Sequence, residues 1–204
     1  MPKTVVFLAE GFEEIEAVTP IDYLRRAGVE VVTAAIPVDG KVDLLVNGAH
    51  GISIKADMTF DEFISSCETL PDALFVPGGM PGAANVGACG LALDFIKKMN
   101  EQKKLVSAIC AAPVVTLAKT GVLAGRKYTC YPGMKKAEDY CGSKEAADKL
   151  TAGATLVTDV PFVVDQNLIT GRGPGTAEQF AMELVEYLCG KETAQKIKAG
   201  SIQR

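Results

Sequence analysis

Short apolar runs rich in Val, Ile and Leu alternate along this chain with longer segments of helical periodicity. Buried strands are expected at 4–9, 29–34, 73–76 and 105–109, and amphipathic helices at 14–27 and 91–99. An alternation of this kind is typical of βαβ units, in which helices cross over a mostly parallel sheet. The sequence therefore predicts an α/β fold with a mostly parallel central sheet.

The remaining segments are shorter, and their turn residues help to place them. Hairpins are expected at two places: an edge hairpin of 42–46 with 51–55, and 162–164 with 168–170. A further strand is expected at 127–130, and further helices at 111–119, 135–140 and 175–188. Gly190 closes the last of these helices. Two interpretations of Pro20 stay open, because Thr19-Pro20 can start a helix or Pro20 can kink a continuous one.

Length and charge limit the organisation of the chain and its partners. Its 204 residues contain no linker-like break, so one domain covering 1–204 is expected. The net charge is -4 and basic residues form no block, which argues against nucleic acid and anionic membranes as partners. No apolar run approaches the roughly 20 residues that cross a bilayer. The N-terminus resembles no targeting signal, so we expect a cytoplasmic protein.

The cysteines and the single histidine indicate free thiols without a metal. Six cysteines occur without a CxxC pair, and a chain of this size needs no disulfides to hold its core. His50 is the only imidazole, and Cys and His never cluster at the spacing of zinc ligands. No metal site is therefore expected.

Cys110 is the residue that most strongly indicates chemistry. It stands between the expected strand 105–109 and the helix that follows, a geometry that resembles a nucleophile elbow. Amide groups at a helix start favour thiolate over thiol, so we expect a lowered pKa and a reactive nucleophile. The alternative is an inert buried thiol, because free Cys is one of the most often buried residue types.

Two loops that follow other strands can complete a site around this thiol. The glycines of 77–82 let backbone amides approach a bound group and form an oxyanion hole, although a tight turn explains them equally well. Glu16 belongs to an acidic run after the first strand. If it points inward, as its neighbours Ala17 and Val18 suggest, burial makes it a proton donor or shuttle. Glu13 and Glu14 are explained by the helix dipole alone.

Arg172 lies in a third junction, Thr170-Gly171-Arg172-Gly173-Pro174-Gly175-Thr176. A cation beside a helix N-terminus can hold an anion, and the alternative is a surface arginine next to a glycine-rich cap.

Four stretches together resemble the ThiJ/PfpI superfamily and its DJ-one-like branch. They are AEGFEEIEAVTPIDYLRRAG at 9–28, FVPGGMPG at 75–82, SAICAAP at 107–113 and TGRGPGT at 170–176. They extend over nearly the whole chain in the family's order. The resemblance implies a flavodoxin-like three-layer sandwich, similar to class I glutamine amidotransferases, that is usually a homodimer. It also implies a terminal helix beginning near Gly190-Lys191-Glu192.

The resemblance also implies roles for individual residues. Cys110 matches the family's redox-sensitive nucleophile, Glu16 the buried acid that hydrogen-bonds it, and Gly79 and Ala111 the amides of the oxyanion site. Family members are credited with cofactor-free glyoxalase or deglycase activity, with protection against oxidative stress and with chaperone-like behaviour; distant relatives are peptidases. Tyr131 stands where many glyoxalase-active relatives carry histidine. Tyrosine, with its usual pKa near ~10, is a poor base at neutral pH but can donate a hydrogen bond.

The expected function is therefore cysteine-dependent turnover of a small dicarbonyl such as methylglyoxal, or of glycated groups, without any cofactor. In this reading Tyr131 lines the pocket. A redox sensor or chaperone that works through Cys110 sulfinate is the alternative from another class. A Cys-His-Glu peptidase is doubtful, since His50 matches an Arg-bearing loop in relatives.

Overall fold

A seven-stranded sheet forms the centre of the computed structural model, which describes residues 1–133 and 137–203. Its strand order is β10-β11-β7-β6-β1-β2-β5, and every neighbouring pair is parallel except β10 with β11. The strands are β1 (Lys3–Leu8), β2 (Glu30–Ala35), β5 (Met58–Thr59), β6 (Ala73–Val76), β7 (Leu105–Ile109), β10 (Phe162–Asp165) and β11 (Leu168–Gly171). The predicted mostly parallel α/β sheet is confirmed.

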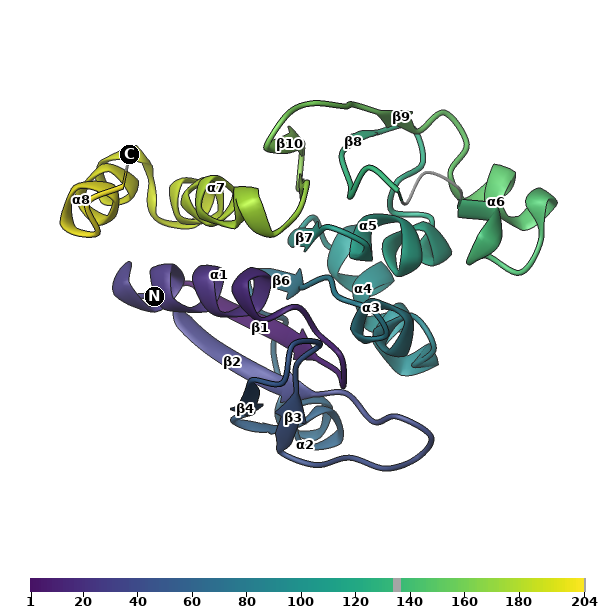
Figure 1. Ribbon diagram of the computed structural model, residues 1–204, viewed down its shortest axis with the longest axis horizontal. Helices are drawn as coiled ribbons and strands as arrows, with labels where there is room; N and C mark the ends of the chain where they lie inside the picture. The colour runs from purple at the N-terminus through teal and green to yellow at the C-terminus, as the bar shows by residue number, and fades with distance from the viewer. Residues whose placement is uncertain (134–136, 204) are drawn as a thin grey trace.

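Helices cover both faces of this sheet. The α-helices are α1 (Glu14–Arg26), α2 (Phe60–Ser66), α3 (Gly82–Val86), α4 (Gly90–Glu101), α5 (Ala112–Val115), α6 (Lys144–Leu150), α7 (Ala177–Cys189) and α8 (Lys191–Gly200). Three short 3-10 turns are Leu117–Thr120, Ala137–Asp139 and Pro174–Thr176. Figure 1 shows α1 and α7 side by side above the sheet and α2 below it. No helix in residues 1–133 or 137–203 is long and apolar enough to span a bilayer.

Aromatic contacts show how the alternating side chains of the strands fill two cores. Phe7 of β1 packs edge-to-face on Phe60 of α2, with ring centroids 5.1 Å apart. Phe75 of β6 packs instead on Phe180 of α7, at 5.6 Å. Phe75 lies opposite Val6 in the register, the neighbour of Phe7, so the two phenylalanines point to opposite faces of the sheet. The molecule is therefore a three-layer sandwich, as the family resemblance implies.

Most of the predicted strands and helices lie within two residues of their predicted positions, whereas α2, α3, α6, β5 and β9 were not predicted. The 162–170 hairpin is confirmed as β10–β11, and Pro20 lies inside the single helix α1. The hairpin at 45–55 also forms, as β3 (Leu45–Asn47) with β4 (Ser53–Lys55), but as a separate sheet. The edge of the main sheet is β5, so the prediction of an edge hairpin is wrong.

Three predictions fail in the chain after Cys110. The helix predicted at 111–119 is broken into α5 and a 3-10 turn that ends at Gly121, whose φ of 77° stops it. The strand predicted at 127–130 is only β8 (Lys127–Tyr128), paired with β9 (Thr155–Leu156) outside the main sheet. Residues 135–136 of the helix predicted at 135–140 lie outside the described residues, and 137–139 form a 3-10 turn.

Candidate functional site

Cys110 lies at a strained turn between β7 and α5. Its φ is 65°, in the left-handed region that residues with a side chain rarely adopt. Two backbone hydrogen bonds hold it there: Cys110 N donates to Gly171 O at 3.0 Å, and Tyr131 N donates to Cys110 O at 2.8 Å. The resulting elbow is nearly sealed, with 9% of Cys110 exposed. The predicted placement of this cysteine at a strand-to-helix turn is confirmed.

Glu16 lies in the first turn of α1 and points inward. It is completely buried, and its Oε2 accepts a hydrogen bond of 3.0 Å from Gly78 N. Glu13 caps the helix, because its Oε2 accepts from Glu16 N at 2.7 Å. The inward orientation was expected partly from Val18, but Val18 is about half exposed and only Ala17 shares the buried side.

Gly78 makes the approach of Glu16 to Cys110 possible. A side chain at this position would collide with Glu16 Oε2, and its Cβ would lie 2.6 Å from Cys110 Cβ. Gly79, the next residue, has a φ of 88°, and its amide and that of Ala111 both interact with the Cys110 sulfur. The glycines after β6 therefore do more than form a turn, and the structure brings together Cys110, Glu16, Gly79 and Ala111.

The electrostatics of this pair differ from the sequence-based expectation. Burial raises the pKa of the Cys110 thiol, and the charge of Glu16 and the hydrogen bond between them raise it further. The amides of Gly79 and Ala111 lower this pKa, as predicted, but they are outweighed. The prediction of a lowered pKa is therefore wrong, because it considered the helix amides and left out burial, which has the largest effect, and the charge of Glu16.

Glu16 is shifted in the same direction. Burial raises its pKa to about 7, and the charge of Glu13 adds to the rise, whereas hydrogen bonds with Cys110 and Gly78 oppose it. Because each ionised partner disfavours ionisation of the other, the pair behaves as one coupled acid that retains a proton near neutral pH. When Glu16 holds this proton, the charge that opposes a thiolate is removed.

Tyr131 and Arg172 border the elbow without contributing charge to it. Tyr131 donates its backbone amide to Cys110, and its side chain is 47% exposed beside Gly173. Arg172 donates to Asp159 Oδ1 at 2.8 Å and lines a cavity of about 180 Å³. The guanidinium is therefore already paired with a carboxylate, which weakens its predicted role as an anion holder.

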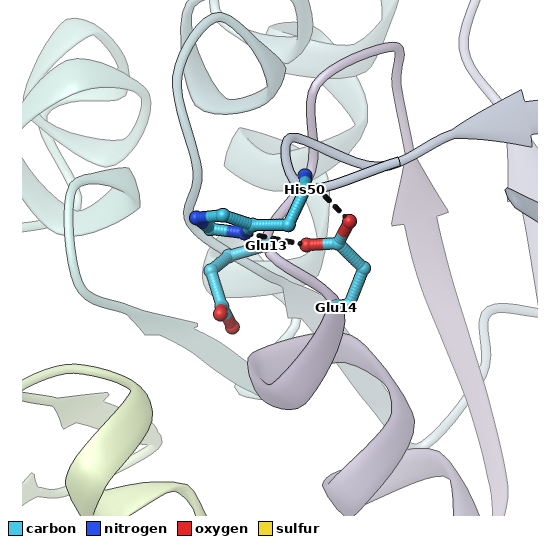
Figure 2. Close-up of side chains that lie close together, drawn as sticks. All are labelled: Glu13, Glu14 and His50. Atoms are coloured by element: carbon cyan, nitrogen blue, oxygen red, sulfur yellow. Dashed lines mark hydrogen bonds and ion pairs between the residues drawn. The ribbon is translucent and has the colours of Figure 1, made fainter. Parts of the chain in front are cut away.

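A second group of side chains, Glu13, Glu14 and His50, meets at the start of α1 and was not predicted from the sequence. Glu14 Oε2 lies 2.9 Å from His50 Nδ1, and Glu14 Oε1 accepts from His50 N at 2.6 Å (Figure 2). Both glutamates are buried, with 8% of Glu13 and 5% of Glu14 exposed. From the sequence, Glu13 and Glu14 are explained by the helix dipole alone, but the dipole does not account for these contacts with His50. No sequence signal connects His50 to Glu14, which lies 36 residues earlier.

All six cysteines are thiols that form no disulfide, as predicted. Cys110 and Cys130 are buried and the other four are partly exposed. Among them, Cys110 has the acid partner and the converging amides described above.

The fold and the elbow cysteine define a family. The model of the DJ-1/PfpI family matches residues 2–187, and the chain belongs to this family. Protein dj-1beta of Drosophila melanogaster is 35% identical over 96% of this chain and 94% of its own length. Protein DJ-1 homolog B of Arabidopsis thaliana is 34% identical over 99% of this chain, which spans only 42% of that longer protein.

Solved structures agree with this assignment. Drosophila melanogaster DJ-1beta superposes with a TM-score of 0.83 at 35% identity, covering 98% of this chain and 97% of the other. Toxoplasma gondii DJ-1, described as oxidized, gives the same TM-score at 33% identity, covering 99% of this chain and 98% of the other.

One sequence relative has a name that states an activity. A protein of Pyrococcus abyssi that is named a deglycase is 32% identical over 91% of this chain and 99% of its own length.

Proposed function

We propose that Cys110 and Glu16 are the catalytic pair of a cofactor-free enzyme of the glyoxalase or deglycase type, acting on methylglyoxal or on glycated groups. The observation that carries the proposal is the convergence of a strained elbow thiol, a buried acid and two backbone amides. The name of the Pyrococcus abyssi relative supports the deglycase class. A small reactive carbonyl suits this site because the thiol is nearly buried.

The reaction begins with the pair holding one proton. This proton passes from the Cys110 sulfur to Glu16 as the sulfur adds to the aldehyde carbon of methylglyoxal. Glu16 then gives the proton to the resulting alkoxide, so a hemithioacetal forms. The amides of Gly79 and Ala111 stabilise the negative oxygen during this addition.

Glu16 then acts as a base. It removes the hydrogen of the former aldehyde carbon as a proton and returns it to the neighbouring carbon, which converts the hemithioacetal into a thioester of lactate. Water hydrolyses the thioester and releases lactate and one proton, which leaves Cys110 and Glu16 with the single proton that they shared at the start. The net reaction converts methylglyoxal and water into lactate and a proton, with no oxidant or reductant. An acid whose pKa lies at about 7 is suited to giving and taking a proton at neutral pH.

Purified protein incubated with methylglyoxal tests this proposal, with lactate measured by an independent enzymatic assay. We expect lactate formation that disappears in Cys110→Ala. Cys130→Ala is the matched control, since it removes the other buried thiol and should retain activity. Equal lactate formation by wild type and Cys110→Ala would refute the role of this cysteine.

A redox sensor that works through Cys110 oxidation is the second candidate, and one observation favours it. A relative with the same fold has been solved in a form described as oxidized. A sulfinate on Cys110 would place its oxygens against the amides of Gly79 and Ala111 and a protonated Glu16. Peptide mass analysis after mild peroxide treatment should find Cys110 oxidised first. Earlier oxidation of Cys67, Cys89 or Cys130 would contradict this candidate.

The homodimer implied by the family resemblance belongs to the same proposal. Ile15 and Val18 on α1, and Leu45 and Ile52 near β3 and β4, are each about half exposed. Covering such side chains with a second copy would remove apolar surface from water. Sedimentation equilibrium should give twice the chain mass at micromolar concentration, whereas a monomer at all concentrations would exclude the dimer.

A further inference from the structure

The start of α1 gathers three potential metal ligands outside the Cys110 site. One ligand atom from each of Glu13, Glu14 and His50 lies within 4.8 Å of the others. Figure 2 shows the His50 ring and the Glu14 carboxylate facing each other; the Glu13 side chain lies next to them, and its carboxylate points away from both. The sequence predicted no metal site because Cys and His do not cluster, but the fold brings the one histidine to two carboxylates.

Three buried carboxyl groups lie close together at the start of α1. Glu13, Glu14 and Glu16 are all buried within four residues of one another. In residues 1–133 and 137–203, no lysine or arginine forms an ion pair with any of them, and only His50 pairs with Glu14. Buried carboxylates are costly unless a cation or several donors compensate their charge.

Hydrogen bonds orient two of these three groups, Glu14 and His50, toward each other. Backbone amides of His50 and Ile52 donate to Glu14 Oε1, at 2.6 Å and 3.3 Å, so that Oε2 faces the His50 ring. Glu13 is fixed through one oxygen by Glu16 N, and its other oxygen accepts no hydrogen bond from the described residues. In metal sites, hydrogen bonds of this kind orient the side chains that bind the metal directly. Gly48 permits the arrangement, since a Cβ there would collide with the Glu14 carboxyl group.

We propose that Glu13, Glu14 and His50 bind one divalent transition-metal ion, of which Zn²⁺ fits the ligands best. One imidazole nitrogen and two carboxylate oxygens form a three-ligand set of the kind that binds zinc and leaves a fourth position to water. His50 Nδ1 and Glu14 Oε2 lie 2.9 Å apart, at hydrogen-bond distance. Two ligands of a tetrahedral zinc, each at about 2.0–2.1 Å, lie about 3.4 Å apart, so Zn²⁺ would replace the proton between these two atoms and move them apart by roughly half an ångström. Neither Mg²⁺ nor Ca²⁺ suits the set, because the imidazole is a poor ligand for them.

The single histidine makes the test direct. Zn²⁺ is added to the full-length protein with ¹⁵N-labelled histidine, and the imidazole nitrogens are followed by NMR. We expect the His50 signals to move to a new position and stop changing at one equivalent. In a parallel titration followed by calorimetry, His50→Gln should weaken Zn²⁺ binding at least about tenfold. His50 is largely exposed, so this variant should keep the fold.

Matched controls separate this site from the thiols and from nonspecific binding. Glu10→Gln changes a nearby acid that contacts Asn47 of the same loop region, and it should leave Zn²⁺ affinity unchanged. Cys110→Ser should also leave it unchanged, so failure of the catalytic proposal and failure of this one are distinguishable. The proposal is overturned if one equivalent of Zn²⁺ leaves the His50 signals unmoved, if His50→Gln binds as tightly as wild type, or if Cys110→Ser abolishes binding.

Discussion

Glu14 and Glu16 lie two residues apart in the first turn of α1, yet their surroundings shift their pKa values in opposite directions. Burial acts on both. At Glu14 it is outweighed by hydrogen bonds from His50 and Ile52, so the pKa of Glu14 is lowered. At Glu16 the donors are few, and burial raises the pKa to about 7. Position at a helix start therefore does not decide the protonation of a carboxylate; the donors around each oxygen do.

Removing the acid next to sulfur should have the largest effect. Glu16→Gln keeps the shape of the side chain and an acceptor for Gly78 N, but it cannot give or take a proton. We expect kcat/KM for methylglyoxal to fall about 100-fold or more, the size of a general acid–base contribution. Glu10→Gln, on the same acidic run but outside the site, is the control. A loss below threefold in Glu16→Gln would show that Glu16 relays no proton.

A side chain at position 78 should disturb the surroundings of Glu16 by steric overlap, without changing any ionisable group. In Gly78→Ala the added methyl group would press against Glu16 and Cys110. We expect the free energy of unfolding to fall by about 2–3 kcal/mol, as for an overpacked core. Gly90→Ala is the matched control, because a Cβ there meets nothing within 4 Å and the residue lies in a helix. Equal stability of both variants in urea would show that Gly78 is not required for close packing.

The comparison also separates what the sequence can predict from what it cannot. Strands β1, β6 and β7 are buried on both faces, so their apolar runs are continuous and their ends could be predicted closely. Helix α2 was missed although Thr59 and Glu62 form a capping box, a signal that the sequence contains. The elbow at Cys110 could be predicted because a parallel sheet places its loops at the carboxyl ends of the strands.

The site could be predicted only as far as local signals reach. The amide groups that follow β7 are close to Cys110 in the sequence, so their lowering of its pKa could be predicted. The burial of the sulfur and the charge of Glu16 depend on how α1 docks against the loop after β6, and these effects reverse the sign of the expected pKa shift. The contact of His50 with Glu14 depends on an irregular loop next to a hairpin that stands apart from the main sheet, which no periodicity describes.

The smallest predicted effect is that of Glu16 on the free energy of unfolding. Its pH dependence tests whether Glu16 and Glu14 are shifted in opposite directions. The pKa of folded Glu16, about 7, lies above the ordinary value of 4.5, so the folded protein binds more protons between these pH values. The contribution of Glu16 to stability is therefore lost as pH rises from about 4.5 through 7. Glu16→Gln should be about 1–2 kcal/mol more stable than wild type at pH 8, and no more stable at pH 4. Sharing of the proton with Cys110 keeps the gain below the full shift.

Glu14→Gln should behave in the opposite way, because the lowered pKa of Glu14 makes its charge stabilising above the ordinary value of 4.5. This variant should be less stable than wild type at pH 8, and the difference should shrink as pH falls through the folded pKa of Glu14. Urea unfolding of both variants and wild type at pH 4, 6 and 8 measures the two trends. If both variants shift stability in the same direction at pH 8, the contrast between the two carboxylates does not determine the stability of this helix start.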